Sequence, residues 1–230
     1  NVPQHRQRPW TDEVASWCED LGCDALVLNL RQQAIDDYAM MWIVATESQN
    51  PREVPAIFER WMAFYERQAI EDMVYVLIIL RRRDAGDTWC VVDREVTSIA
   101  GSCGAELTQR LATLAILHHL HDEADLLREH VRLNPTVRIV QEHAMTPDGP
   151  RVVANRLENR GRLRTSAQLD ARVMRLLVCC DGQEPLGAIL AGMADELGLT
   201  VDRVAQVAVP VVRHLLERGF LQLGHMSPDA

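Results

Sequence analysis

Residues 68–83 read QAIEDMVYVLIILRRR, an apolar run that ends in three consecutive arginines. The uninterrupted apolar part, from Met73 to Leu80, is eight residues long, whereas a membrane-spanning helix needs about twenty. The run is therefore too short to cross a membrane. Its β-branched and aromatic residues predict a buried strand instead, and Arg81 to Arg83 then mark the point where that strand leaves the core for solvent.

The composition is that of a globular protein large enough for one big domain or two small ones. Of the 230 residues, 47% are apolar and 25% are charged, which excludes a disordered chain and a disulfide scaffold. The N-terminus, NVPQHRQRPW, is polar and lacks the apolar stretch of a signal peptide. The six cysteines form no C-x-x-C pair, as expected for reduced core cysteines. We therefore expect a cytoplasmic protein that has no membrane partner.

Metal binding is a minor alternative in two places. Cys179 and Cys180 are adjacent, and His118, His119 and His121 form the run HHLH. A zinc site needs about four convergent ligands, and no second ligand cluster is evident beside either group. We therefore predict no metal site.

The first part of the chain alternates helical and extended patterns. Residues 11–21 have an amphipathic helical spacing behind a candidate N-cap, Thr11, and residues 23–30 predict a strand buried on both faces. Helices are expected at 34–45 and 51–70, before the strand at 73–80. The sequence therefore predicts an α/β domain over residues 1–84.

The remaining residues, 85–230, predict an α+β domain. Strands are expected at 88–96, 136–145, 151–158 and 161–166, and helices at 105–119 and 123–133. Three short amphipathic helices follow at about 167–222, and Pro210 should kink the last one or split it in two. Three helices beside a β-hairpin are typical of a winged-helix-like module.

Arginines are concentrated at the start of this last region. All 24 basic residues of the chain are arginines, and residues 151–175 contain seven of them against two acids, in a chain of net charge −9. The candidate nucleic-acid contacts lie on and around the predicted hairpin: Arg151, Arg156, Arg160, Arg162 and Arg164. Arginines on such a wing would contact phosphates of RNA or DNA. The alternative is a solvated or ion-paired hairpin in a lysine-free protein.

An ordered set of motifs resembles one family of enzymes. Asn1 is followed by WTDEVASW (10–17), CDALVLNLR (23–31), IDDYAMMWI (35–43), FERWMAFYE (58–66) and MVYVLIILRRR (73–83). Near the C-terminus come LVCCDGQEPLGAILAGMADELGL (177–199) and VVRHLLERGFL (211–221). In this order they resemble the end of a class I S-adenosylmethionine-dependent methyltransferase. The resemblance is to a group related to the release-factor glutamine and ribosomal RNA methyltransferases, together with that group's extra C-terminal domain.

The resemblance implies a partial Rossmann-like sheet in residues 1–84, whose last strand is antiparallel and inserted beside the preceding one. It also implies S-adenosyl-L-methionine as the cofactor of an intact parent enzyme. The chain has no glycine-rich cofactor loop of the family's form and no Pro-Pro for the catalytic motif. We therefore expect the cofactor-binding and catalytic residues to lie upstream of Asn1, and name none here. NVPQ (1–4) fits the turn after the family's fifth strand, where Asn1 and His5 would line an acceptor pocket; the alternative is a frayed terminus.

Two functions follow as expectations. In the first, the chain is the C-terminal part of a methyltransferase acting on a protein glutamine or an RNA base, inactive alone, with a domain that presents the RNA or protein substrate. In the second, it is a non-catalytic binding or regulatory module of winged-helix type. If the chain is such a fragment, strands 23–30 and 73–80 leave an uncovered sheet edge, which favours self-association.

Overall fold

The computed structural model describes residues 1–19, 21–47, 50–84, 86–120 and 122–224. The chain divides into two compact units, Asn1–Val96 and Thr97–Ala230. The described residues form a mixed α/β structure with three sheets. The boundary lies after Val96 rather than after residue 84, because a strand at residues 90–93 still belongs to the first sheet. None of the helices that the described residues form is long and apolar enough to cross a membrane.

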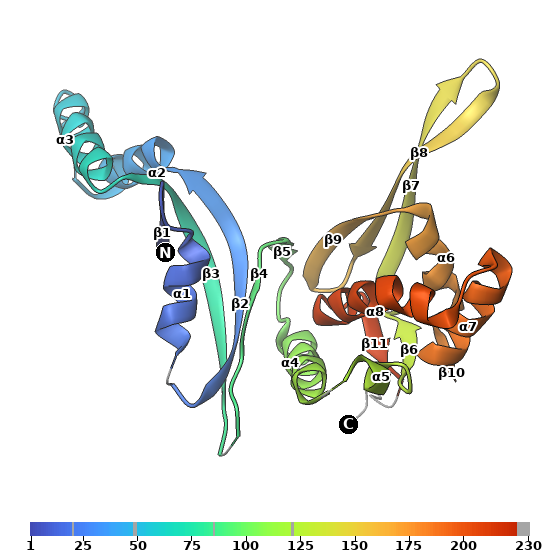
Figure 1. The fold of residues 1–230 in the computed structure, drawn as a ribbon. Coiled ribbons are helices and arrows are strands. Elements are labelled where there is room, and N and C mark those ends of the chain that lie inside the picture. Colours follow the sequence, from blue (N-terminus) through green and yellow to red (C-terminus); the bar gives the residue numbers. More distant parts are fainter. Residues whose placement is uncertain (20, 48–49, 85, 121, 225–230) are drawn as a thin grey trace. The chain divides into compact units, whose positions relative to one another are not determined.

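The first unit is built on a four-stranded sheet (Figure 1). Its elements in chain order are β1 (Val2–His5), α1 (Trp10–Cys18), β2 (Cys23–Ala34), α2 (Ile35–Trp42), the π-helical turn η1 (Ile43–Glu47), α3 (Val54–Arg67), β3 (Ile70–Arg82) and β4 (Cys90–Asp93). The strand order is β1-β3-β2-β4. Strand β3 is antiparallel to both β1 and β2, and β4 is parallel to β2. The last long strand therefore lies between two strands that run parallel to each other.

Helices pack on both faces of this sheet. Val74 of β3 belongs to the cluster that contains Trp10 and Val14 of α1. The next residue along β3, Met73, packs against the cluster formed by α2 and α3. Because neighbouring residues of a strand point to opposite faces, α1 and the α2–α3 pair cover opposite faces. Strand β2 is buried on both, as predicted, with Ala25 to Leu28 fully buried.

Four details of this unit differ from the sequence-based expectations. The strands expected to leave an uncovered edge, β2 and β3, are the two inner strands of the sheet. Residues Val2–His5 form a strand rather than a turn, because they pair with β3 from Val74 to Ile70. The apolar run in β3 is mostly half-buried, and only Val74 is fully buried. Helix α1 begins at Trp10, and Thr11 lies inside it without capping it.

The second unit contains two further sheets. Its elements are β5 (Val96–Ile99), which begins at the boundary, α4 (Gly104–His119), α5 (Glu123–Leu126), β6 (His130–Leu133), β7 (Val137–Thr146), β8 (Gly149–Asn159), β9 (Leu163–Leu169), α6 (Ala171–Cys179), β10 (Asp181–Pro185), α7 (Leu186–Leu197), α8 (Val201–Glu217) and β11 (Leu221–Leu223). The strand orders are β5-β9-β8-β7 and β10-β6-β11. Figure 1 shows the β7–β8 hairpin projecting beyond β9.

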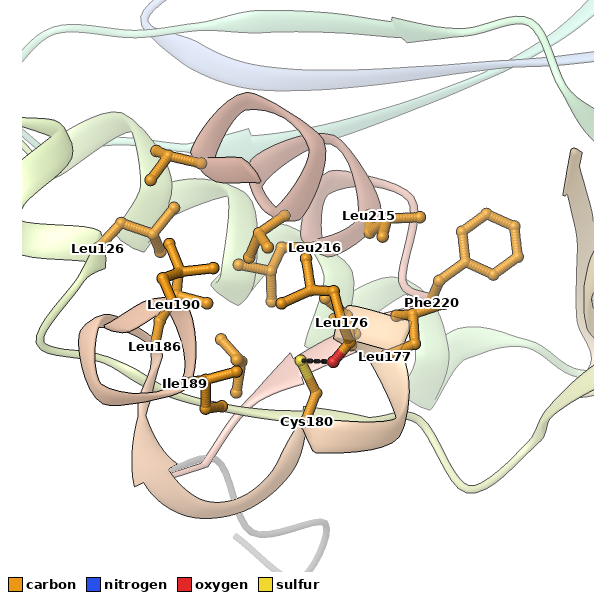
Figure 2. Close-up of a cluster of buried hydrophobic side chains, with 14 of the residues drawn as sticks. Leu126, Leu176, Leu177, Cys180, Leu186, Ile189, Leu190, Leu215, Leu216 and Phe220 are labelled. Carbon is orange, nitrogen blue, oxygen red and sulfur yellow. Dashed lines mark hydrogen bonds between the residues drawn. The ribbon is translucent and has the colours of Figure 1, made fainter. Parts of the chain in front are cut away.

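The helices α6, α7 and α8 and the small sheet β10-β6-β11 share one core. Figure 2 shows leucines of these helices in one cluster with Phe220 and Cys180. The thiol of Cys180 donates to the carbonyl of Leu176 at 3.3 Å. Burial raises the pKa of the Cys180 thiol to about 12. Cys180 is therefore a core thiol.

Several predictions for this unit need correction. Residues 123–133 were expected to be helical, but only Glu123–Leu126 are, because β6 pairs with β10 on one side and β11 on the other. The predicted strand at 88–96 is two strands, separated where Asp93 accepts from the backbone of Glu95 at 2.8 Å. Of the two outcomes predicted at Pro210, a kink or a split, the split does not occur, because Pro210 lies inside the continuous helix α8.

Gly198, directly after α7, and Gly192, inside it, allow a direct test of the C-terminal cap of the helix. Gly198 ends the helix with φ +64°, a conformation that costs an alanine about 1 kcal/mol. Gly192 lies in the helix interior, where an added Cβ meets no atom within 4 Å. We expect Gly198→Ala to destabilise the unit by about 1 kcal/mol, and Gly192→Ala to stabilise it by about 0.5–1 kcal/mol. Urea denaturation measures both, and equal signs would contradict this assignment of the cap.

Candidate functional site

Three of the five predicted arginines line one hollow on the sheet β5-β9-β8-β7 of the second unit. The hollow has a volume of about 530 Å³, and Arg156, Arg160 and Arg164 line it. Arg156 pairs with Gln168, and Glu158 pairs with Ser166, in the β8–β9 ladder. Because residues two apart in a strand share a face, Arg164 projects to the same face as Ser166, Glu158 and Arg156. The pleat of β8 and β9 thus brings Arg156 and Arg164 to one face, and Arg160 follows directly after the end of β8.

A single carboxylate organises two of these arginines. Glu158 accepts ion pairs from Arg156 at 2.8 Å and from Arg160 at 2.9 Å. Hydrogen bonds from Arg160 and then from Arg156 lower the pKa of Glu158 below its usual value. The residues that line the hollow include three arginines and one glutamate, so the hollow has an excess of positive charge that suits an anion.

The other two arginines lie elsewhere. Arg151 lies near the far end of the hairpin, where it pairs with Ala144 close to the turn. Arg162 lies in the turn before β9, and its backbone N–H donates to Glu106 of α4 at 2.8 Å. The same carboxylate accepts from the N–H of Leu163. Glu106 therefore anchors the turn that positions the arginines, and sequence reasoning missed it because the contact spans 56 residues.

Hydroxyl groups complete the hollow and were also missed. Thr97, Thr165 and Ser166 line it beside the arginines. Thr97 donates to the carbonyl of Arg164 at 3.1 Å and so links β5 to β9. The hydroxyl of Thr165 is buried without a partner among the described residues. The alternating strand pattern of LRTSAQL (163–169) was the sequence signal for Thr165 and Ser166. Thr97 lies beside the hollow only because β5 pairs with β9.

The arginines around the hollow lie on the sheet β5-β9-β8-β7, and this sheet shares a core with the three helices. Val137 of β7 and Leu157 of β8 belong to the same buried cluster as leucines of α6, α7 and α8, and so do residues of the small sheet β10-β6-β11. The winged-helix-like arrangement of these helices with the hairpin stays a prediction.

The two candidate residues of the first unit are not brought together. Asn1 is exposed and precedes β1, whereas His5 ends it, so β1 separates them by roughly 13 Å at about 3.3 Å per residue. His5 lies near the backbone carbonyl of Gln68, with its Nδ1 at 3.0 Å from that oxygen. Only His5 therefore lies at the carboxyl end of a strand, where ligands of parallel sheets bind.

Polar side chains that sequence reasoning missed lie at the same end of this sheet. Strands β1 and β2 both end there, and the start of β3 lies between them. Gln32 donates to Asp72 at 2.9 Å, and the hydroxyl of Tyr75 donates to Gln33 at 3.1 Å. The end of the sheet thus carries amide and carboxylate groups beside His5.

No group of three metal-ligating side chains occurs among the residues that the structure describes. His118 and His119 lie at the end of α4, and His121 lies outside the described residues. Cys179 is exposed whereas Cys180 is buried.

The described residues form a mixed α/β protein of two units, the second of which carries an arginine-lined hollow. Residues 108–223, half of the chain, match the model of a domain of unknown function, DUF7782. The chain belongs to this family. The matched region runs from α4 to β11, and it includes the arginines around the hollow. No curated protein matches the sequence.

Proposed function

We propose that residues 1–96 form the C-terminal part of a methyltransferase-type sheet. The observation that carries this proposal is the strand order: β3 lies between β1 and β2 and is antiparallel to both. The resemblance of residues 1–83 implies such a final strand. If strands paired only with their neighbours in sequence, β1 would pair with β2 or remain unpaired. The observed pairing of β1 with β3 therefore supports the proposal.

The chain by itself does not fit the cofactor. The connections from β1 to α1 and from β2 to α2 contain no glycine, whereas a nucleotide-type cofactor needs a turn in which the backbone can approach it closely. We therefore derive no step through S-adenosylmethionine. What this chain can supply is positioning: methyl transfer to nitrogen is an in-line displacement in which the acceptor must be held in place, and His5, Gln32 and Asp72 lie where polar groups would hold it.

The test compares the chain with the complete product of its gene. We expect calorimetric titration of residues 1–230 with S-adenosylmethionine to give no binding heat, and the complete product to bind it with micromolar affinity. Transfer of a radiolabelled methyl group to total RNA or total protein then identifies the class of acceptor. Micromolar binding to residues 1–230 alone would contradict the assignment of the cofactor site. An initiator methionine immediately before Asn1 would remove the methyltransferase proposal altogether.

We propose a second function for the second unit, the binding of RNA phosphates in the arginine hollow. The three arginines and the hydroxyl groups around them support this proposal, because guanidinium groups bind phosphate oxygens through paired N–H donors. The hollow offers no apolar or aromatic platform on which bases could stack. Binding is therefore expected to be tolerant of sequence and dependent on salt.

Charge reversal tests this binding. We expect Arg156→Glu/Arg160→Glu/Arg164→Glu to reduce the slope of log affinity against log salt by about 2 for single-stranded RNA, at about 0.7 per phosphate contact. Glu158→Gln should strengthen binding, because it frees Arg156 and Arg160 from their ion pairs. Arg162→Glu is the matched control from the same hairpin. Fluorescence anisotropy of a labelled oligonucleotide measures each, and an unchanged slope in the triple variant would refute RNA binding in the hollow.

A further inference from the structure

An apolar groove runs over the helices α6, α7 and α8, on a part of the molecule that the proposed functions do not use. Its volume is about 400 Å³. The apolar side chains that line it include Leu176, Met193, Leu197, Leu199, Val204 and Val207. Val207 is 69% exposed and Leu197 is 51% exposed. Apolar side chains of this size in contact with water at a concave surface are typical of a binding site.

The rim of the groove is positively charged. Arg172 at the start of α6 and Arg203 in the first turn of α8 line it. Neither arginine forms an ion pair with any residue in the described parts of the chain. The one acid that lines the groove, Asp170, caps α6, where it accepts from the backbone of Arg172 at 2.7 Å and of Val173 at 2.8 Å. The groove therefore combines an apolar floor with two cations available to a partner.

The exposed side of α8 is unsuited to reading nucleic acid. A recognition helix contacts base edges through polar and charged side chains. The positions of α8 that line the groove are instead Arg203, Val204, Val207, Ala208 and Val211, so four of these five are apolar. Their spacing of three and four residues forms a stripe along one side of the helix. Such a stripe matches the apolar face of another helix.

We infer that this groove docks an amphipathic helix of a partner protein, one with apolar residues at positions i, i+3, i+4 and i+7 and with acidic residues flanking them. The acidic flanks are expected because Arg172 and Arg203 would pair with carboxylates at the edge of an apolar contact. The lining stretch of α8, residues 203–211, is about 12 Å long at about 1.5 Å per residue. The occupant therefore needs roughly two to three helical turns.

The probe is a pair of fluorescein-labelled model peptides used with residues 1–230. Both are about sixteen residues long, roughly four turns, with leucine at the four apolar positions. One carries glutamate at the flanking positions and the other carries lysine. We expect the acidic peptide to bind with micromolar affinity, about tenfold or more tighter than the basic one, since like charges oppose docking. Fluorescence anisotropy measures both.

Variants of the chain locate the binding. Val207→Glu should lower the affinity for the acidic peptide by about tenfold or more, because it places a charge in the apolar contact. Arg172→Glu/Arg203→Glu should invert the preference, so that the basic peptide binds more tightly. Val178→Glu is the matched control, because Val178 is a 72% exposed valine of α6 that does not line the groove. All of these positions except Val178 line the groove, and the circular dichroism of each variant should match that of the parent chain.

Three results would overturn the inference. The first is equal affinity for the two peptides, or an equal loss of affinity for the acidic peptide in Val207→Glu and Val178→Glu. The second is binding of an RNA oligonucleotide that Arg172→Glu/Arg203→Glu abolishes, which would assign the rim to phosphates. The third is a concentration-dependent dimer, seen by light scattering and lost in Val207→Glu, which would assign the groove to a second copy of this chain.

Discussion

Replacing Arg81 with methionine is expected to destabilise the first unit by about 3–5 kcal/mol, the usual cost of removing one partner from a buried ion pair. Asp24 lies on β2 with a side chain that is 0% exposed, and Arg81 on β3 donates to its Oδ2 at 2.6 Å. Arg83 contributes a weaker contact at 3.8 Å. Without Arg81 the carboxylate stays buried with little compensation for its lost hydration.

The reciprocal change should cost less. In Asp24→Asn the guanidinium groups lose a partner, but the side chains of Arg81 and Arg83 are 33% and 23% exposed and can regain water. Replacing both partners, as in Asp24→Leu/Arg81→Met, should recover most of the stability lost in Arg81→Met, because an apolar pair needs no compensation. Urea denaturation, with hydrogen exchange at the amides of residues 23–33 and 70–82, measures each variant.

The matched control is an exposed pair in the same unit. Glu66 pairs with Arg6 at 3.2 Å, and both side chains are more than half exposed. Glu66→Gln should therefore change the free energy of unfolding by less than about 1 kcal/mol. If Arg81→Met costs no more than Glu66→Gln, the pair with Asp24 does not hold β2 and β3 in register.

The second large effect is expected at Phe220. Its side chain is fully buried in the core that it shares with α6, α7 and α8 (Figure 2). Phe220→Ala should cost about 3–5 kcal/mol through lost burial and the cavity left behind. The guanidinium of Arg218, itself only 6% exposed, lies 5.2 Å from the centre of the ring. The substitution therefore also removes a favourable cation–π contact.

Graded substitutions separate packing from other causes. Phe220→Leu retains most of the apolar volume and should cost about 1.5 kcal/mol or less, whereas Val178→Ala, at a 72% exposed position, should change stability by less than about 0.5 kcal/mol. Thermal unfolding followed by circular dichroism gives the order of the three variants. Equal losses in Phe220→Ala and Phe220→Leu would show that volume in this core is not what stabilises it.

Local patterns predicted the type and place of many elements. The buried strand at Cys23–Ala34, the helix at Gly104–His119, and the helix that ends at Gly198 follow from apolar periodicity and one glycine. These signals are local, because each depends on residues within a turn or a few strand positions. They failed at His130–Leu133, where pairing on both sides with β10 and β11 overrides the helical pattern.

The candidate site shows the same division. The concentration of arginines at 151–164 was visible in the sequence, but the sequence does not separate Arg156, Arg160 and Arg164, which share the hollow, from Arg151 and Arg162, which lie outside it. Their places in the folded sheet make that separation, because Arg151 lies near the β7–β8 turn and Arg162 lies in the turn before β9. Glu106 and Thr97 come from other elements and join the arginines only through the folded sheet and α4.

The sequence by itself determined that this is an α/β chain with arginine as its only basic residue and with an apolar run too short for a membrane. The fate of that run's final arginines was decided by the tertiary structure. The sequence predicted that Arg81 to Arg83 leave the core for solvent, and this is wrong for two of them, since Arg81 and Arg83 both approach the buried carboxylate of Asp24. Asp24 is 57 residues from Arg81 along the chain, and only the antiparallel register of β2 and β3, which pairs them directly, brings the opposite charges together.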